Sequence, residues 1–354
     1  MTTTTIDETK LRSIISQAVS DFGGTVTAAL VTIGDRLGLY KALREMGSAT
    51  HEELATSTGS SERYLRHWLL NQAASGYIDY SPETGKYSLS PEQALVFADD
   101  ESPAAMAGGF GLMTSVVKDE AKIAEAMMTG TGMLWSDHDP DLFLGSARFF
   151  KPSYVANIVQ NWIPALTDIQ DTMEQGATAA DIGCGYGIST IIMAKAYPKS
   201  RFFGFDNHPE SIEYARQAAR EAGVADRITF EVAAAQEFPG RVYDLLTYFD
   251  CFHDMGDPEG AADHARHVLS LGGSVLLVEP MAGDTVEENL NPFGRLFSAA
   301  SVLICTPHAI AEGGKALGAI ATDAELKAIF DRAGFGTFRR ATETLTNRVF
   351  EAKP

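Results

Sequence analysis

The sequence predicts a mixed α/β protein in which a doubly wound, mostly parallel sheet follows a mostly helical, winged-helix-like N-terminal region. From residue 177 onward, apolar segments of strand length alternate with segments of helical periodicity, which is typical of a sheet covered by helices on both faces. Before residue 100, helices, a turn and a small hairpin follow one another. The 354 residues are enough for two domains.

Composition excludes several classes of protein. Lys and Arg number 28 and Asp and Glu number 47, so the net charge is −19. A chain this acidic repels polyphosphate, which weighs against a nucleic-acid partner. Three widely spaced cysteines predict neither a disulfide framework nor a zinc motif. The polar N-terminus and the short apolar stretches predict a cytoplasmic protein without a signal peptide or membrane association.

The first helical region covers residues 11–46, where apolar residues recur at a spacing near 3.6. Gly23-Gly24 and Gly34 interrupt this pattern. Because glycine weakens a helix interior, we expect two or three helices here rather than one.

The next segment has the outline of a winged helix. Thr50 and Glu53 form a capping box for a short helix, a second helix starts near Ser61, and residues 77–89 predict a hairpin. Such a module binds DNA or serves as a dimerisation contact. Its mildly acidic composition favours dimerisation, because a DNA-binding domain normally carries a basic face.

Five apolar segments predict the parallel strands, and two more predict a closing hairpin with an antiparallel strand. The segments are 179–182, 201–205, 228–232, 243–249 and 274–278, with the hairpin at 337–341 and 349–352. Ligands of such sheets bind beyond the carboxyl ends of the strands, so the residues at these ends are the candidates for function.

A glycine-rich loop follows the first strand. Asp181 precedes Gly183, Gly185 and Gly187, and the third glycine comes one position earlier than in a dinucleotide-binding fingerprint. Asp206 ends the next strand, where an acid can accept both hydroxyls of a ribose. An acid before the loop repels a pyrophosphate but attracts an ammonium group. A nucleoside that carries an amino acid therefore fits better than a dinucleotide.

These motifs resemble the S-adenosylmethionine (SAM) site of class I methyltransferases. Together with the winged-helix-like N-terminal segment, these motifs resemble those of small-molecule O-methyltransferases of the plant caffeate and bacterial polyketide type. This group includes mycobacterial and actinobacterial members that are sometimes labelled transcriptional regulators. It implies a Rossmann-like seven-stranded methyltransferase domain, SAM as cofactor, S-adenosylhomocysteine (SAH) as product and no metal. The cofactor contacts that it implies are Asp181, Gly183, Gly185, Gly187, Asp206, Asn207, Ala235, Gln236 and Phe249.

The end of the fourth strand resembles the family's stretch in which a histidine is the general base. That residue is His253 here, and Glu279 matches one of two glutamates that flank it in plant members. The position of the second, near Ile320-Ala321, holds no acid. A histidine near neutral pKa can take the proton that a phenol loses during methyl transfer. The alternative is that His253 only orders its loop.

These observations predict three parts: a dimerisation domain at 1–100, a helical linker and acceptor-pocket region at 101–160, and a methyltransferase domain at 161–354 with a lid-like insertion at 281–321. We expect a homodimeric enzyme that methylates a small aromatic or apolar acceptor, on oxygen in preference to nitrogen. The alternative is a SAM-sensing winged-helix transcriptional regulator.

Overall fold

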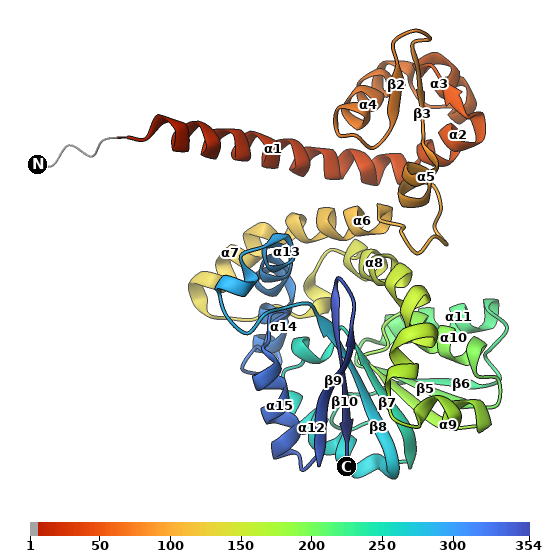
Figure 1. The fold of residues 1–354 in the computed structure, drawn as a ribbon, viewed down its shortest axis with the longest axis vertical. Helices are drawn as coiled ribbons and strands as arrows, with labels where there is room; N and C mark the ends of the chain where they lie inside the picture. The colour runs from red at the N-terminus through yellow and green to blue at the C-terminus, as the bar shows by residue number, and fades with distance from the viewer. Residues whose placement is uncertain (1–5) are drawn as a thin grey trace, which may run out of the picture. The chain divides into compact units, whose positions relative to one another are not determined.

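The computed structural model describes residues 6–354, and the chain forms two compact units, Met1–Thr114 and Ser115–Pro354 (Figure 1). The first unit holds a three-stranded antiparallel sheet in the order β1-β3-β2 with helices around it. Its elements are α1 (Glu8–Arg36), α2 (Leu39–Met46), β1 (Ser48–Ala49), α3 (His51–Thr58), α4 (Glu62–Ala74), β2 (Asp79–Ser81), β3 (Lys86–Ser88) and α5 (Pro91–Phe97). The helix α6 (Ala107–Val116) follows and contains the boundary between the units.

The winged-helix outline predicted from the sequence is confirmed. The capping box at the start of α3 is present, because Thr50 accepts a hydrogen bond from the Glu53 backbone while the Glu53 carboxylate accepts one from the Thr50 backbone. The hairpin of β2 and β3 lies within the predicted segment. Helix α3, helix α4 and this hairpin pack around one buried apolar cluster that includes Leu54, Leu65 and Ile78.

Residues 11–46 form two helices, α1 and α2, as expected, but the breaks predicted at the glycines are wrong. Helix α1 runs without interruption through Gly23, Gly24 and Gly34 and ends at Arg36. Packing explains the third glycine, because a Cβ at Gly34 would lie 2.4 Å from the Trp68 ring of α4. The Trp68 indole N–H also donates to the Leu30 carbonyl at 2.8 Å. The close approach of α4 therefore outweighs the low helix propensity of glycine.

Substitution of these glycines should have opposite effects. We expect Gly34→Ala to destabilise the first unit by about 1–3 kcal/mol, because the added methyl group overlaps the Trp68 ring. Gly24→Ala is the matched control, since nothing lies within 4 Å of its Cβ, and it should stabilise the helix by about 1 kcal/mol. Chemical unfolding of the full chain measures both effects, and a Gly34→Ala variant as stable as the wild type would contradict the packing argument.

The second unit is built on a seven-stranded sheet in the order β6-β5-β4-β7-β8-β10-β9. Its strands are β4 (Thr178–Ile182), β5 (Arg201–Asp206), β6 (Ile228–Val232), β7 (Tyr243–Phe249), β8 (Leu269–Pro280), β9 (Thr337–Glu343) and β10 (Asn347–Lys353). Strands β4 to β8 pair in parallel, and β10 is antiparallel to both of its neighbours. The predicted Rossmann-like sheet and its closing hairpin are thus confirmed.

The longer helices of the second unit are α7 (Glu120–Thr129), α8 (Asp141–Asn157), α9 (Ile169–Gln175), α10 (Ile188–Ala196), α11 (Pro209–Glu221), α12 (Pro258–Val268), α13 (Pro292–Ala300), α14 (Thr306–Ala311) and α15 (Asp323–Arg332). Short helical turns are η1 (Val117–Asp119), η2 (Trp135–Asp137), η3 (Ile158–Trp162), η4 (Ile163–Ala165), η5 (Phe252–Asp254), η6 (Glu287–Asn289) and η7 (Ser301–Cys305). Helices α9, α10 and α11 pack on one face of the sheet, and α12 and α15 pack on the other.

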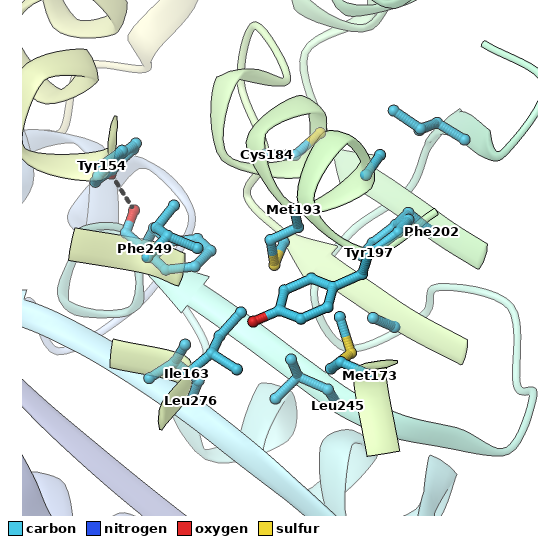
Figure 2. Close-up of a cluster of buried hydrophobic side chains, with 14 of the residues drawn as sticks. Tyr154, Ile163, Met173, Cys184, Met193, Tyr197, Phe202, Leu245, Phe249 and Leu276 are labelled. Atoms are coloured by element: carbon cyan, nitrogen blue, oxygen red, sulfur yellow. Dashed lines mark hydrogen bonds between the residues drawn. The ribbon is translucent and has the colours of Figure 1, made fainter. Parts of the chain in front are cut away.

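The cluster on the first face anchors the functional edge of the sheet. Figure 2 shows Met193 of α10 and Tyr197, which follows that helix, packed over Phe202 and Leu245 of the strands, with Tyr154 at the edge of the cluster. The Tyr154 hydroxyl donates to the Phe249 carbonyl at 3.3 Å. Helix α8 is therefore fixed to the carboxyl end of β7.

Two helical segments have the length and apolar composition of a membrane span, contrary to the expectation that every apolar stretch is too short. The segment Pro292–Ala311 is 44% buried, as is common for a helix of a globular domain. The other is α1, of which 11% is buried.

Candidate active site

A cavity of the second unit opens at the carboxyl ends of β4, β5 and β7. The chain leaves β4 toward β5 on one side and later returns to β7 on the other, so the cavity lies at the switch point where open α/β sheets bind ligands. Seven of the residues expected to hold the cofactor line it: Gly183, Gly185, Asp206, Asn207, Ala235, Gln236 and Phe249. Asp181 and Gly187 lie behind its wall.

The loop between β4 and α10 requires its glycines. Gly183 and Gly187 have φ values of 69° and 75°, a region that side chains other than glycine rarely adopt. A Cβ on Gly183 would lie 2.8 Å from the Cys251 sulfur, and one on Gly187 would lie 2.7 Å from the Phe230 ring. The backbone of the loop is thus packed closely on one side and open to the cavity on the other.

Asp181 supports this loop from inside the fold. Its side chain is buried and accepts hydrogen bonds from the hydroxyls of Ser189 at 2.6 Å, Thr190 at 2.6 Å and Thr247 at 2.9 Å. Burial raises the pKa of Asp181 to about 6, although these three hydroxyls favour the ionised form. Because the carboxylate is surrounded by protein groups, it positions the loop and does not face the cavity.

Asp206 faces the cavity and also binds the loop. One carboxylate oxygen accepts from the Gly185 N–H and the other from the His208 N–H, both at 2.9 Å. Burial raises the pKa of Asp206, and the two backbone bonds act in the opposite direction. Each carboxylate oxygen has a second lone pair, so Asp206 can still accept hydrogen bonds from a ligand.

Glu312 is a wall residue that the sequence reading missed. Its carboxylate accepts from the Asn207 side chain at 2.9 Å and from the Gly256 N–H at 3.0 Å. It lies just after α14, in the segment expected to form a lid, and lines the cavity beside Asn207. No motif or period in the sequence marks this residue.

Aromatic side chains form another wall. Phe143 of α8 stacks on His208 with a ring separation of 4.2 Å, and Trp135 packs against Phe143. All three line the cavity. The aromatic-rich stretch 101–160 was expected to contribute to a pocket, but its composition could not single out Trp135 and Phe143 from the residues of the core.

His253 lies beside the cavity without lining it. Its Nδ1 is 2.7 Å from the Glu279 carboxylate, and its Nε2 is 3.3 Å from Asp254. His253 is buried, whereas Asp254 lines the cavity. Burial lowers the pKa of His253, but the carboxylates of Glu279 and Asp254 outweigh burial and hold the pKa well above its ordinary value. The two residues that the sequence nominated for catalysis therefore form a buried pair.

Asp250 is a further buried acid on the cavity wall. It has a positive φ of 51°, and its carboxyl group accepts from the Tyr154 hydroxyl at 3.2 Å and the Asn347 amide at 2.7 Å. Burial, with a smaller contribution from Glu279, raises its pKa to about 8. Its protonated form is thus favoured in the folded protein, and the protein becomes less stable as the pH rises from about 4 toward 8.

Asp250→Asn should remove this pH dependence. Asparagine cannot ionise, tolerates a positive φ and can still accept from Asn347. We expect the variant to gain about 1 kcal/mol or more at pH 8, roughly 2–4 °C in Tm, and to match the wild type near pH 4. Thermal unfolding at both pH values measures the difference. An equal shift in Tm at both would show that Asp250 is not held protonated.

Comparisons with known proteins agree with both parts of the fold. Residues 173–334 match the model of a methyltransferase domain, and residues 25–98 match the model of an Rv2258c-like winged HTH domain. These matches confirm the resemblance inferred from the glycine loop and the winged-helix outline.

Individual proteins are similar over part or all of the chain. Trans-aconitate 2-methyltransferase of Streptomyces coelicolor is 35% identical over 82 residues, or 23% of this chain and 27% of its own length. The curated relatives are matched over 27% to 59% of their length.

Solved structures match the whole chain. Human N-acetylserotonin methyltransferase in complex with SAM has a TM-score of 0.71 at 15% identity and covers 100% of this chain and 99% of its own. Mitomycin 7-O-methyltransferase has a TM-score of 0.70 at 19% identity, with 98% and 100% covered. At such identities the likeness shows the shared fold.

Proposed function

We propose that this chain, which carries a methyltransferase domain behind an Rv2258c-like winged-helix domain, is a SAM-dependent methyltransferase that acts on a small aromatic or apolar acceptor. The observation that carries the proposal is the cavity at the sheet's switch point, where the glycine loop and Asp206 lie side by side. Oxygen is the preferred acceptor atom, since solved neighbours of the same fold include O-methyltransferases.

SAM fits the polar end of the cavity. Asp206 would accept from the ribose hydroxyls, and the loop around Gly183 would present its backbone to the methionine part. Ala235 and Gln236 would border the adenine. The sulfonium of SAM carries a positive charge, and buried carboxyl groups at the same edge favour a cation. The human neighbour that was solved with SAM supports this choice of cofactor.

The transfer itself needs little chemistry from the protein. The acceptor oxygen attacks the methyl carbon, the carbon–sulfur bond breaks with its electron pair moving to sulfur, and SAH is released. Positioning of the two reactants supplies much of the rate. The acceptor hydroxyl must also lose a proton. His253, oriented by Glu279 through Nδ1, is the proposed base, and its Nε2 lies 3.3 Å from Asp254 on the cavity wall. Because the carboxylates around it hold the pKa of His253 well above its ordinary value, the residue acts from its neutral form, whose share grows as the pH rises.

The apolar end of the cavity would hold the acceptor. Trp135 and Phe143 come from the region before the sheet, and His308 comes from α14. Rings such as these suit a flat apolar ligand, because stacking adds to the burial of apolar area. The proposed acceptor pocket thus combines the stretch 101–160 with the lid-like segment 281–321.

Replacement of His253 tests the role of the base. We expect His253→Ala to lower the rate of methyl transfer from labelled SAM about 10²–10⁴-fold, the usual contribution of a general base, and to leave SAH binding unchanged. Asp206→Ala should instead abolish SAH binding, measured by calorimetry. His267→Ala, an exposed histidine of α12, is the control and should retain full activity.

Two results would contradict parts of the proposal. Full activity in His253→Ala would be consistent with a methyltransferase but would show that His253 is not its general base. Failure of the wild type to bind SAM or SAH would overturn the function itself.

We also propose that the enzyme is a homodimer that associates through α1. Ile15, Val19, Phe22 and Val26 recur at intervals of four, three and four residues, and all four are exposed. This spacing forms one apolar stripe along the helix, and an exposed stripe of this kind marks a protein contact. A second copy of the same helix offers a matching surface.

A charge placed on the stripe should dissociate the dimer. We expect wild-type protein to sediment as a dimer at micromolar concentration and Phe22→Glu to sediment as a monomer. Ser20→Glu, on another side of the same helix, is the matched control and should remain dimeric. A monomeric wild type would contradict the proposed homodimer.

The regulator alternative has less support. Lys41, Arg44 and Lys86 of the winged-helix unit each form an ion pair with a carboxylate of the same unit. A basic side chain that is neutralised in this way contributes less to the attraction of DNA phosphates.

A further inference from the structure

Three side chains with metal-ligating atoms converge at the cavity wall, which one of them, Asp254, lines. His253 and Asp254 belong to η5, and Cys305 is the last residue of the π-helical turn η7. The His253 ring nitrogen, an Asp254 carboxylate oxygen and the Cys305 sulfur all lie within 4.8 Å of one another. A π-helical turn is rare and often occurs at functional sites.

The hydrogen bond from His253 to Glu279 determines which ring nitrogen of His253 is available to bind an ion. If Nδ1–H donates to Glu279 across 2.7 Å, the neutral ring directs the Nε2 lone pair at Asp254. The facing oxygen, Oδ1 of Asp254, is buried and has no hydrogen-bond partner among residues 6–354. Two electron-rich atoms 3.3 Å apart require a positive charge between them. Either a proton on Nε2 or a metal ion can supply it.

The ligand types favour a metal ion. A proton on Nε2 satisfies the imidazole and the carboxylate, but an ion can also bind the Cys305 sulfur. Burial raises the pKa of the Cys305 thiol, so the metal–sulfur bond forms with release of the thiol proton to water. Imidazole, carboxylate and thiolate are the three ligand groups of protein zinc sites. Tetrahedral zinc, with bonds of about 2.0–2.1 Å to nitrogen and oxygen, separates these two atoms by about 3.3 Å, the distance found between Nε2 and Asp254.

We propose that His253, Asp254 and Cys305 bind Zn²⁺. Glu279 acts as the outer carboxylate that fixes the ring, an arrangement typical of zinc-binding histidines. Asp254 lines the cavity, so the ion enters from there and keeps a fourth position for water or another small ligand. Zinc here is an inhibitor and not a cofactor of the proposed reaction.

Zinc binding has a consequence for methyl transfer, and this consequence alone rests on the proposed function. An ion on Nε2 occupies the lone pair that would otherwise take the acceptor's proton. Zinc-loaded protein should therefore lose activity in proportion to its occupancy. Binding itself requires neither SAM nor an acceptor, so the two proposals can fail separately.

The test uses the full chain with Co²⁺ as a spectroscopic probe for the zinc site. The His51→Ala variant serves as background, because His51, Glu52 and Glu62 form a second cluster at the surface. We expect one equivalent of Co²⁺ to give the visible absorption of a tetrahedral ion and a thiolate-to-cobalt charge-transfer band. Zn²⁺ should abolish both signals, and Mg²⁺, which prefers oxygen ligands, should not.

Variants then identify the ligands. Cys305→Ser should remove the charge-transfer band and weaken Zn²⁺ binding at least tenfold, whereas Cys184→Ser, another buried cysteine, should retain both. Glu279→Gln should weaken binding about 10–100-fold, as loss of an outer carboxylate does.

The first spectrum needs only the surface substitution His51→Ala and leaves every proposed ligand in place, so misfolding of a ligand variant cannot hide the result. Absence of the charge-transfer band would show that a proton alone occupies the cluster and would overturn the proposal. A band that persists in folded Cys305→Ser would overturn it as well.

Discussion

The buried carboxylate of Asp181 is the contact on which the functional edge depends. It is the last residue but one of β4, and its three hydroxyl partners lie at the start of α10 and in β7. One side chain thus fixes the strand before the glycine loop, the helix after it and the neighbouring strand across the switch point. The loop can then turn through left-handed conformations while its backbone lies against Asp206. The side of the glycine loop that faces the cavity can stay open because the Asp181 hydrogen bonds fix the strands and helix on its other side.

The same edge concentrates acidic groups that are costly to ionise. Burial raises the pKa of Asp181, Asp206 and Asp250, and Glu279 adds a fully buried carboxyl group behind them. Several buried acids at one edge cannot all ionise unless a cation compensates them. The His253 imidazolium is one such cation in the protein itself. The proposed sulfonium and zinc ions would also compensate the negative charge of these buried carboxylates. This explains why two different cations are proposed to bind in one small region.

The sequence predicted the sheet well because its signals are local. The bounds 228–232 and 243–249 coincide with β6 and β7, since segments rich in β-branched, aromatic and other apolar residues, bounded by turn residues, are typical of strands. The glycine loop was found by its fixed spacing. Glu312 was missed as a wall residue because packing between distant segments places it there. Asp250 directly follows β7, but its burial depends on Tyr154 and Asn347, which are distant in the sequence. The break predicted at Gly34 failed for a related reason, since the ring that excludes a side chain is 34 residues away in the chain.

Glu312 also joins the two ends of the cavity. Its carboxylate binds Asn207, which follows the strand end assigned to the cofactor, and Gly256, which follows the turn that carries His253. It belongs to the segment that also supplies His308 to the wall proposed for the acceptor. A ligand that moves Asn207 must therefore either break a charge-assisted hydrogen bond or carry Glu312 with it. If the two ends hold the donor and the acceptor as proposed, Glu312 belongs to the wall of both, and a shift of Asn207 at one end is passed through Glu312 to the other.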